Sequence, residues 1–293
     1  MQPTQLDGIE ICALIADGES QLATGPHPER ARLDAEFLLL HILRKSDPAR
    51  NRAWLIAHGN SPTSHGAEFR VLIARRLNGE PIQYITGDAE FFGLSFHVTP
   101  AVLIPRPESE HLVEEVLRLA ANCAQPRIAD IGTGSGAIAV SLAHSLPAAS
   151  IVATDISSAA LAIAQDNAER NHVAKRIRFL EGDLLGPLTG LSFDIIVSNP
   201  PYIPLTDRES LSVEVREHEP HGALFAGDDG LAIYRRLIPE AHALLTSGGW
   251  LVLEIGYGQQ RPIEDLLLAS GYVEIDFVAD YQGIPRVAIA QCL

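Results

Sequence analysis

From residue 126 onward, short apolar runs alternate with segments of helical pattern, and this alternation restricts the fold more than any other feature. The strand-like runs are RIADIG, SIVATDI, IRFLEGD, FDIIVSN and GWLVLEIG, and helical segments such as AIAVSLAHSL lie between them. Continuous apolar strands joined by helices predict an α/β fold with a mostly parallel sheet covered on both faces. Two strand-like runs around Gly283 predict an antiparallel pair at the sheet edge.

The N-terminal part has a different pattern, typical of a helical bundle. In ARLDAEFLLLHILR, a helix would place five apolar residues roughly on one face, the pattern of a helix that packs against a core: Leu33, Phe37, Leu40, Ile42 and Leu43. A second helix, GAEFRVLIARRLNG, is expected to end at Asn78–Gly79. Prolines, glycines and short β-prone runs then indicate a linker with a hairpin. We therefore expect a helical domain (1–78), a β-hairpin linker (79–106) and an α/β domain (107–293).

Composition narrows the function classes. The chain of 293 residues carries a formal net charge of −15, which disfavours duplex DNA as a partner. Its three cysteines form no C-x-x-C pair, so neither a disulfide framework nor a metal site is expected. We see no secretory signal and no apolar run long enough to cross a membrane, and we expect a soluble, cytoplasmic protein.

A glycine-rich turn follows the first strand of the α/β part. In DIGTGSGAIAV, Gly132, Gly134 and Gly136 allow the backbone to turn sharply and to approach a ligand closely. The dinucleotide fingerprint tolerates alanine in its last place, so this spacing does not exclude NAD. A tight turn without a ligand is the structural alternative.

Acidic residues follow the next two strands. Asp155 ends SIVATD, where a carboxylate can accept hydrogen bonds from both hydroxyls of a ribose. Its structural alternative is a helix N-cap. Asp183 could contact an adenine amino group, or its neighbour could form a wall for the ring, although a solvated turn aspartate is the alternative. The turn and Asp155 together predict a bound nucleoside without identifying it.

The tetrapeptide NPPY, at the end of the fourth strand, distinguishes between nucleoside-binding enzymes. An amide or aromatic NH₂ group is a poor nucleophile because its lone pair is shared with a π-system. The side-chain oxygen of Asn199 and the main-chain oxygen of Pro200 can accept hydrogen bonds from such a group. Pro200 and Pro201 stiffen this turn, and Tyr202 can stack on the planar group. NPPY beside a nucleoside site therefore predicts a methyltransferase that uses S-adenosyl-L-methionine and needs no metal.

Two functional alternatives and one structural alternative remain open from the residues. A DNA adenine-N6 methyltransferase could use the same tetrapeptide, but the net charge and the lack of a basic, aromatic-rich region disfavour it. A non-catalytic binding module with a relic nucleoside fold is disfavoured by the intact glycine turn, Asp155 and NPPY. A rigid loop without chemistry is the structural alternative for NPPY itself.

Over nearly its whole length the chain resembles the release factor glutamine methyltransferases, also called the PrmC or HemK family. The matching segments are GEPIQYITG, FFGLSFHVTPAVLIPRPESEHLVE, DIGTGSGAIAV, SNPPYI and EIGYGQ. A ribosomal-protein glutamine methyltransferase is a further alternative, and only the linker motif separates it. The most specific segment is IPRPESE (104–110), because these related enzymes usually differ after the PR pair. The resemblance implies a class I, Rossmann-like methyltransferase domain behind the helical domain, and we expect the helical domain to dock the protein substrate.

The resemblance also implies the substrate and the site. The acceptor would be the amide nitrogen N5 of the glutamine in the Gly-Gly-Gln motif of class 1 peptide chain release factors. The expected cofactor contacts are Gly132, Thr133, Gly134, Ser135, Gly136, Asp155, Asp183, Leu184 and Asn199, and the expected glutamine contacts are Asn199, Pro200, Pro201 and Tyr202. The family often has an aromatic residue where this chain has Leu184, so an aliphatic wall for the adenine is expected. Arg106 and Glu108 could shape the linker, contact substrate or form a salt bridge.

Overall fold

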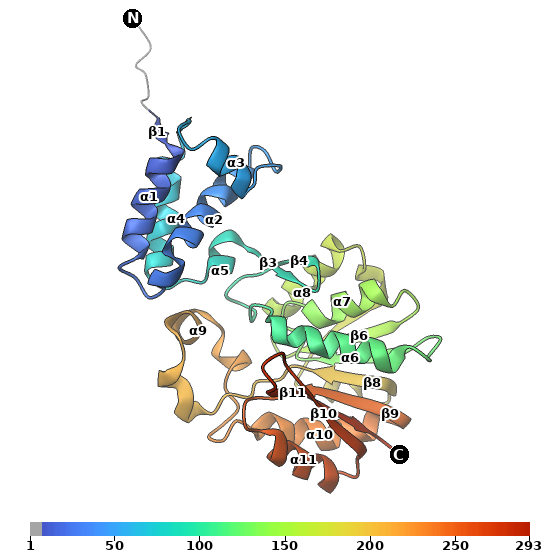
Figure 1. Ribbon diagram of the computed structural model, residues 1–293. Coiled ribbons are helices and arrows are strands. Elements are labelled where there is room, and N and C mark those ends of the chain that lie inside the picture. Colours follow the sequence, from blue (N-terminus) through green and yellow to red (C-terminus); the bar gives the residue numbers. More distant parts are fainter. Residues whose placement is uncertain (1–7) are drawn as a thin grey trace, which may run out of the picture. The chain divides into compact units, whose positions relative to one another are not determined.

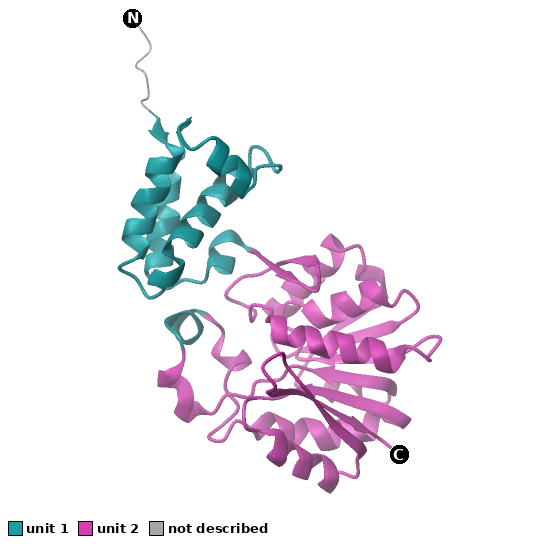
Figure 2. Ribbon diagram, viewed as in Figure 1, with its two compact units in different colours: residues 1–87, 212–218 teal, residues 88–211, 219–293 magenta. Residues whose placement is uncertain are grey.

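The structure is a computed structural model that describes residues 8–293. It divides the chain into two compact units, coloured in Figure 2. The helical unit runs to Gly87 and also includes Ser212–His218, while the sheet unit contains Asp88–Leu211 and Glu219–Leu293. Residues 1–7, which the predicted helical domain includes, lie outside the described residues. The three-part division at residues 78 and 106 stays a prediction.

The helical unit is built from short helices around an apolar core. Its elements are β1 (Ile9–Glu10), α1 (Ile11–Leu22), α2 (Ala31–Arg44), α3 (Arg52–Ala57), β2 (Pro62–Thr63), α4 (Gly66–Leu77), α5 (Ile82–Thr86) and α9 (Val213–His218) (Figure 1). Leu14, Leu38 and Phe69 are buried at the centre of this core. α4 ends at Leu77, and Gly79 adopts a left-handed φ of 84°, so the predicted stop at Asn78–Gly79 is confirmed.

The buried face of α2 differs from the sequence prediction. Leu40, Ile42 and Leu43 are buried as expected, but Leu33 and Phe37 are 46% and 45% exposed. The buried residues of the helix also include Ala31, Asp34, Ala35, Glu36, Leu38 and Leu39. The prediction for Leu33 and Phe37 was wrong because the apolar pattern took no account of a buried acid.

That buried acid belongs to an ion-pair network inside the helical unit. Arg76 Nε on α4 donates to Asp34 Oδ2 at 2.6 Å, and both side chains are at least 96% buried. Arg76 Nη1 also pairs with Glu214 of α9. The network therefore connects α9, which follows the NPPY segment in the chain, to the core of the helical unit.

Within residues 8–293 the largest sheet has seven strands, in the order β10-β11-β9-β8-β5-β6-β7. The strands β5 (Arg127–Ile131), β6 (Ser150–Asp155), β7 (Ile177–Glu181), β8 (Phe193–Ser198) and β9 (Leu245–Glu254) pair in parallel. β10 (Val273–Ala279) and β11 (Pro285–Gln291) add antiparallel pairs at one edge. The predicted mostly parallel sheet with an antiparallel edge pair is thus confirmed. Because β5 lies between β6 and β8, the loops after β5 and β8 diverge to opposite faces and leave a crevice.

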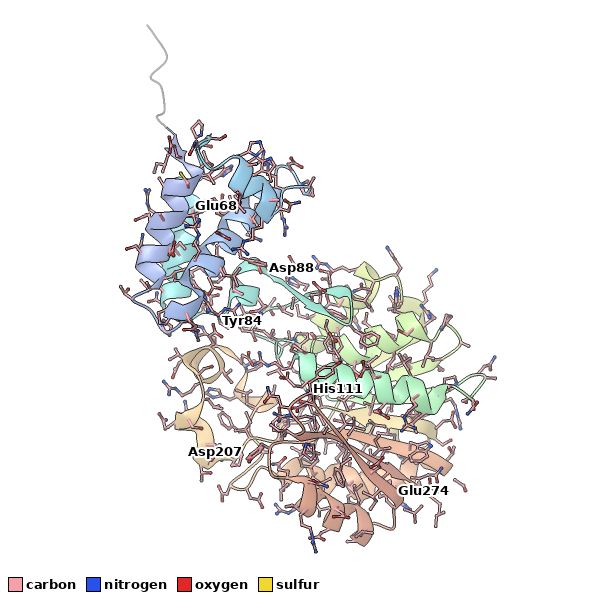
Figure 3. All side chains as sticks on the ribbon, in the orientation of Figure 1. Glu68, Tyr84, Asp88, His111, Asp207 and Glu274 are labelled. Atoms are coloured by element: carbon pink, nitrogen blue, oxygen red, sulfur yellow. The ribbon has the colours of Figure 1, made fainter. Side chains whose placement is uncertain are left out.

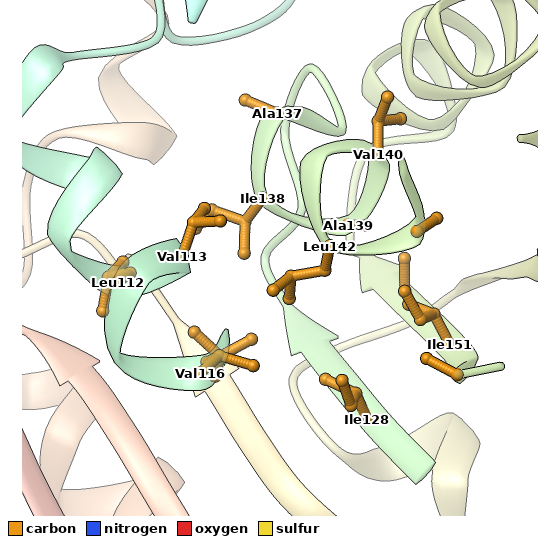
Figure 4. Packing of buried hydrophobic residues seen from close by; sticks show 14 of the residues in the cluster. Leu112, Val113, Val116, Ile128, Ala137, Ile138, Ala139, Val140, Leu142 and Ile151 are labelled. Carbon is orange, nitrogen blue, oxygen red and sulfur yellow. The ribbon is translucent and has the colours of Figure 1, made fainter. Parts of the chain in front are cut away.

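Helices cover both faces of this sheet (Figure 1). α6 (Glu110–Ala120), α7 (Ala137–Ser145) and α8 (Ser158–Arg170) pack on one face, and α10 (Ala232–Leu244) and α11 (Gln260–Ala269) on the other. Successive side chains of a strand point to opposite faces, so Ile128 joins the first core and Ala129 the second. Figure 4 shows Val113 of α6 beside Ile138 of α7 in the first core. No helix in the described part of the chain has the length and apolar character that crossing a membrane requires.

The predicted hairpin is confirmed as β3 (Asp88–Phe91) and β4 (Leu94–His97). Asn167 of α8 is fully buried, and its Oδ1 accepts a hydrogen bond from His97 N at 2.6 Å. Its Nδ2 donates to the carbonyl oxygens of His97 and Ser135, both at 2.9 Å. Asp88, labelled in Figure 3, pairs with Arg170 of α8 at 3.1 Å. The hairpin is therefore held by the same helix that supports the glycine-rich turn.

Candidate active site

A cavity of about 520 Å³ opens at the carboxyl ends of β5, β6 and β8, where the order of the sheet leaves its crevice. Most of the residues that the sequence predicts for the site line it: Gly132, Thr133, Gly134, Ser135, Asp155, Asp183, Leu184, Asn199 and Pro201. Gly136, Pro200 and Tyr202 are near it in the chain but are not among the lining residues.

The glycine-rich turn between β5 and α7 has three residues in the left-handed region. The φ angles of Gly132, Gly134 and Gly136 are 72°, 55° and 79°. A Cβ atom placed on Gly132 or Gly134 would meet no protein atom within 4 Å, whereas one on Gly136 would lie 3.1 Å from Ala164 Cβ. The first two glycines therefore leave open space toward the cavity, and the third permits close packing of α7 on α8.

Asp130, the buried acid before this turn, was not identified from the sequence. Its Oδ2 accepts hydrogen bonds from Thr133 Oγ1 at 2.6 Å and from Ala139 N at 3.2 Å. Burial raises the pKa of Asp130 to about 7. The carboxyl group holds the turn to the start of α7. An acid inside an otherwise apolar strand was the signal that could have revealed it.

Asp155 connects the end of β6 to the glycine-rich turn. Its Oδ2 accepts a hydrogen bond from Gly134 N and its Oδ1 accepts one from Ser157 N, both at 2.9 Å. The N-cap of α8 is Ser157, whose Oγ accepts from Ala160 N. A carboxylate has about four lone-pair sites, so Asp155 can still accept two further hydrogen bonds on the side of the cavity.

Aliphatic side chains line the cavity near Asp155. Leu184, at a left-handed φ of 47°, is held by the hydrogen bond from Thr154 Oγ1 to its carbonyl oxygen at 3.0 Å. Ile156 lines the same cavity and is 71% exposed, although the sequence analysis did not select it. Asp183 forms an ion pair with Arg236 at 2.5 Å. Ile156 and Leu184 thus offer an aliphatic wall, as expected from the sequence.

Hydrogen bonds connect the NPPY turn to Ser109 and to the segment EIGYGQ (254–259). Asn199 Nδ2 donates to Ser109 Oγ at 2.9 Å, and Ser109 Oγ donates to Glu254 Oε2 at 2.5 Å. The hydroxyl of Tyr202 donates to Glu254 Oε1 at 3.3 Å, and Gln259 Nε2 donates to the Tyr202 carbonyl oxygen at 2.9 Å. Burial raises the pKa of Glu254 to about 7. The stacking of Tyr202 on a substrate stays a prediction, since its ring packs against the second core.

Ser109 and Glu254 were also missed by the sequence analysis, although both lie in segments that carry the family resemblance. Arg106, in the same IPRPESE segment, lines the cavity and pairs with Glu219. Its Nη2 lies 2.6 and 2.7 Å from the two carboxylate oxygens of Glu219, which is buried. Of the roles left open for Arg106, the salt bridge is therefore present in the structure.

The Rossmann-like sheet, the glycine-rich turn and the adjoining NPPY turn define a class I methyltransferase. Comparisons with known families agree: residues 109–214 match the model described as "Methyltransferase small domain", and residues 13–87 match "PrmC N-terminal domain". The chain belongs to the family of release factor glutamine methyltransferases.

The family assignment rests on the similarity to curated relatives. The release factor glutamine methyltransferase of Geobacter sulfurreducens is 46% identical over 261 residues, which cover 88% of this chain and 89% of that protein. The one of Moorella thermoacetica is 48% identical over 265 residues, which cover 89% of this chain and 92% of that protein. Both matches include the helical part as well as the sheet.

Solved structures support the fold of the sheet unit. A 16S rRNA methyltransferase of Thermus thermophilus, RsmC, determined with AdoMet and guanosine, aligns with a TM-score of 0.53 at 24% identity. The alignment covers 70% of this chain and 50% of RsmC. A methyltransferase from Pyrococcus furiosus aligns with a TM-score of 0.50 at 18% identity, over 78% of this chain and 98% of that protein.

Proposed function

We propose that this protein transfers a methyl group from S-adenosyl-L-methionine to the side-chain amide nitrogen N5 of the glutamine in the Gly-Gly-Gln motif of class 1 peptide chain release factors. One observation carries the proposal: the glycine-rich turn with Asp155 and the amide of Asn199 line the same cavity. A nucleoside-bearing donor and a planar amide acceptor can therefore meet there. Family membership supports release factor glutamine as the acceptor, and a substrate that acts in translation supports a cytoplasmic location.

The residues present fit S-adenosyl-L-methionine. Gly132 and Gly134 leave open the space that a Cβ would fill, and Asp155 has acceptor sites left for two ribose hydroxyls. Ile156 and Leu184 provide apolar surface for an adenine ring. When bound, this cofactor supplies an electrophilic methyl group on a sulfonium and leaves as a neutral thioether.

Asn199 and Pro200 offer the acceptors that a conjugated nitrogen needs. Within the described residues, neither Asn199 Oδ1 nor the Pro200 carbonyl oxygen accepts a hydrogen bond. Asn199 lines the cavity, so its Oδ1 is available to a substrate NH₂ group, whereas Pro200 is buried and enters only as the proposed second acceptor. Hydrogen bonds to these oxygens would raise the electron density on the nitrogen and orient its lone pair. The two prolines and the contacts of Tyr202 hold the oxygens in place before the substrate arrives.

Localising the transferred methyl group tests this function. The protein is incubated with isotope-labelled S-adenosyl-L-methionine, a class 1 release factor and duplex DNA, and the label is located by mass spectrometry. A release factor with Gln replaced by Ala in its Gly-Gly-Gln motif is the matched control. We expect label on that glutamine alone, whereas label in the DNA or on the Ala variant would contradict the proposal.

We also propose that the helical unit docks the release factor. The support is the two-part organisation, in which none of the described residues of the helical unit lines the cavity. Removing residues 1–78 should therefore weaken release factor binding strongly, and binding of S-adenosyl-L-methionine reports whether the truncated protein is folded. An unchanged affinity for the release factor in a cofactor-binding variant would rule out this role.

A further inference from the structure

The amide of Asn199 can be placed in two orientations that fill the same space and differ in chemistry. With Oδ1 toward the cavity it accepts a hydrogen bond from a substrate amino group, and with Nδ2 toward the cavity it can only donate one. Only the first orientation helps the reaction proposed above, on which the present inference rests. The structure shows this orientation, because Nδ2 is engaged by Ser109 Oγ at 2.9 Å.

The hydroxyl of Ser109 favours this orientation because it has a single proton. Ser109 is buried, and it donates that proton to Glu254 Oε2 at 2.5 Å, a length typical of charge-assisted hydrogen bonds. An ionised carboxylate can only accept, so the Ser109 oxygen must accept from Asn199. We propose that Ser109 and Glu254 are positioning residues for methyl transfer, which keep the Asn199 oxygen turned toward the substrate through this chain of hydrogen bonds.

The surroundings of Glu254 fix its carboxylate at the end of this chain. Tyr202 OH donates to its other oxygen at 3.3 Å, and Tyr234 OH of α10 donates to its main-chain oxygen at 2.6 Å. Burial raises the pKa of Tyr202, so its hydroxyl keeps its proton and remains a donor. Arg286 of β11 favours the ionised form of Glu254, and Glu108 disfavours it. Glu254 thus contacts both Tyr202 of the NPPY turn and the serine that orients Asn199.

Protonation of Glu254 would reverse the direction of the hydrogen bonds that link Glu254, Ser109 and Asn199. A protonated carboxyl group can donate to Ser109, whose own proton would then turn toward Asn199 and favour the amide with Nδ2 outward. Burial raises the pKa of Glu254 to about 7, so the carboxylate forms as the pH rises through that value. Methyl transfer should therefore increase with pH over the same range.

The test measures kcat and the KM for S-adenosyl-L-methionine between about pH 6 and about pH 8.5, with the release factor as acceptor. The variants are Ser109→Ala, Ser109→Thr and Glu254→Gln. Ser141→Ala is the matched control, since it removes another buried hydroxyl, on α7, that is outside this chain of hydrogen bonds. Thermal unfolding of each variant reports whether it is folded.

We expect Ser109→Ala to lower kcat about tenfold with little change in KM, and Ser109→Thr to restore most of it. In Glu254→Gln the amide oxygen can still accept the hydrogen bond from Ser109, and the side chain no longer titrates. Its kcat should stay within about fivefold of the wild type at high pH and lose the acidic decline that the wild type and Ser141→Ala show.

An unchanged kcat in Ser109→Ala, or an acidic decline that persists in Glu254→Gln, would overturn the inference. If Ser109→Ala does not fold, the pH profile of Glu254→Gln decides alone. A wild-type protein that leaves the release factor unmethylated would instead contradict the proposed function, so the two failures can be told apart.

Discussion

Asp155 Oδ2 accepts a hydrogen bond from Gly134 N at 2.9 Å, which joins the end of β6 to the turn that follows β5. The carboxylate also holds the start of α8 through Ser157 N. The residue proposed to bind the ribose is therefore fixed by two backbone contacts before any ligand is present. Such preorganisation lowers the entropy cost of binding.

Replacing Asp155 by Ala should raise the dissociation constant of S-adenosyl-L-methionine at least about tenfold, because hydrogen bonds from two ribose hydroxyls are lost. Isothermal titration calorimetry measures this constant. Asp166→Ala, on the exposed surface of α8, is the control and should bind as the wild type does. An unchanged affinity in Asp155→Ala would contradict the ribose assignment.

Gly134 and Gly190 form a matched pair, which tests whether the cofactor uses the open space beside the glycine-rich turn. Both have positive φ angles, 55° and 84°, and a Cβ on either would meet no protein atom within 4 Å. Alanine should cost each variant about 1 kcal/mol of stability through the left-handed backbone. Of the two variants, only Gly134→Ala should also lose cofactor affinity, as measured by calorimetry, because Gly134 lines the cavity and Gly190 does not. Equal affinities in the two variants would show that the space at Gly134 is not used.

The buried carboxyl group of Asp130 should make stability fall as the pH rises. Its pKa is about 7 in the folded protein against the ordinary aspartate value of 3.8, so between these values the native state binds more protons than the unfolded state. The free energy of unfolding then decreases with pH, by up to about 1.4 kcal/mol per unit. Asp130→Asn removes this contribution.

Urea unfolding of wild type and Asp130→Asn at about pH 5 and about pH 7 measures the effect. The decrease in stability between the two pH values should be smaller in the variant by about 2 kcal/mol. Asp166→Asn, with a half-exposed carboxylate, serves as the control and should keep the decrease of the wild type. Identical decreases in Asp130→Asn and wild type would show that the carboxyl group is not protonated in the native state.

Two arginines of α4 should differ sharply in their effect on stability. Arg76 pairs with Asp34 where both side chains are buried, whereas Arg70 and Asp17 are about half exposed and 3.9 Å apart. Arg76→Ala removes the buried partner of Asp34 and leaves it the more exposed Arg30, 3.4 Å away, so we expect the free energy of unfolding to fall by about 3 kcal/mol. Arg70→Ala should cost less than about 1 kcal/mol. Similar losses in denaturant unfolding would contradict this account of the helical core.

The periodicity of the sequence was sufficient to predict the sheet. β5, β8 and β9 are buried on both faces, and such strands appear as continuous apolar runs. The face of α2 was not predictable in this way, because the buried Asp34 pairs with Arg76, 42 residues later in the chain, as well as with the nearby Arg30.

The sequence likewise identified Asn199 as a site residue, but not the residues that orient its side chain. Ser109 and Glu254 are 90 and 55 residues from Asn199, and the fold alone brings them together. Neither serine nor glutamate has a local pattern that indicates such a role. Ile156, by contrast, follows Asp155 directly, and its position at the end of β6 was a signal that could have been used.

The most direct test of the account is the single-turnover rate of methyl transfer in Asn199→Ala, measured beside its affinity for S-adenosyl-L-methionine. Losing the amide oxygen removes an acceptor that acts on the reacting nitrogen, so we expect the rate to fall at least about 100-fold. The dissociation constant of the cofactor should change less than about tenfold. A rate close to that of the wild type, in a variant that still binds cofactor, would contradict the role of Asn199.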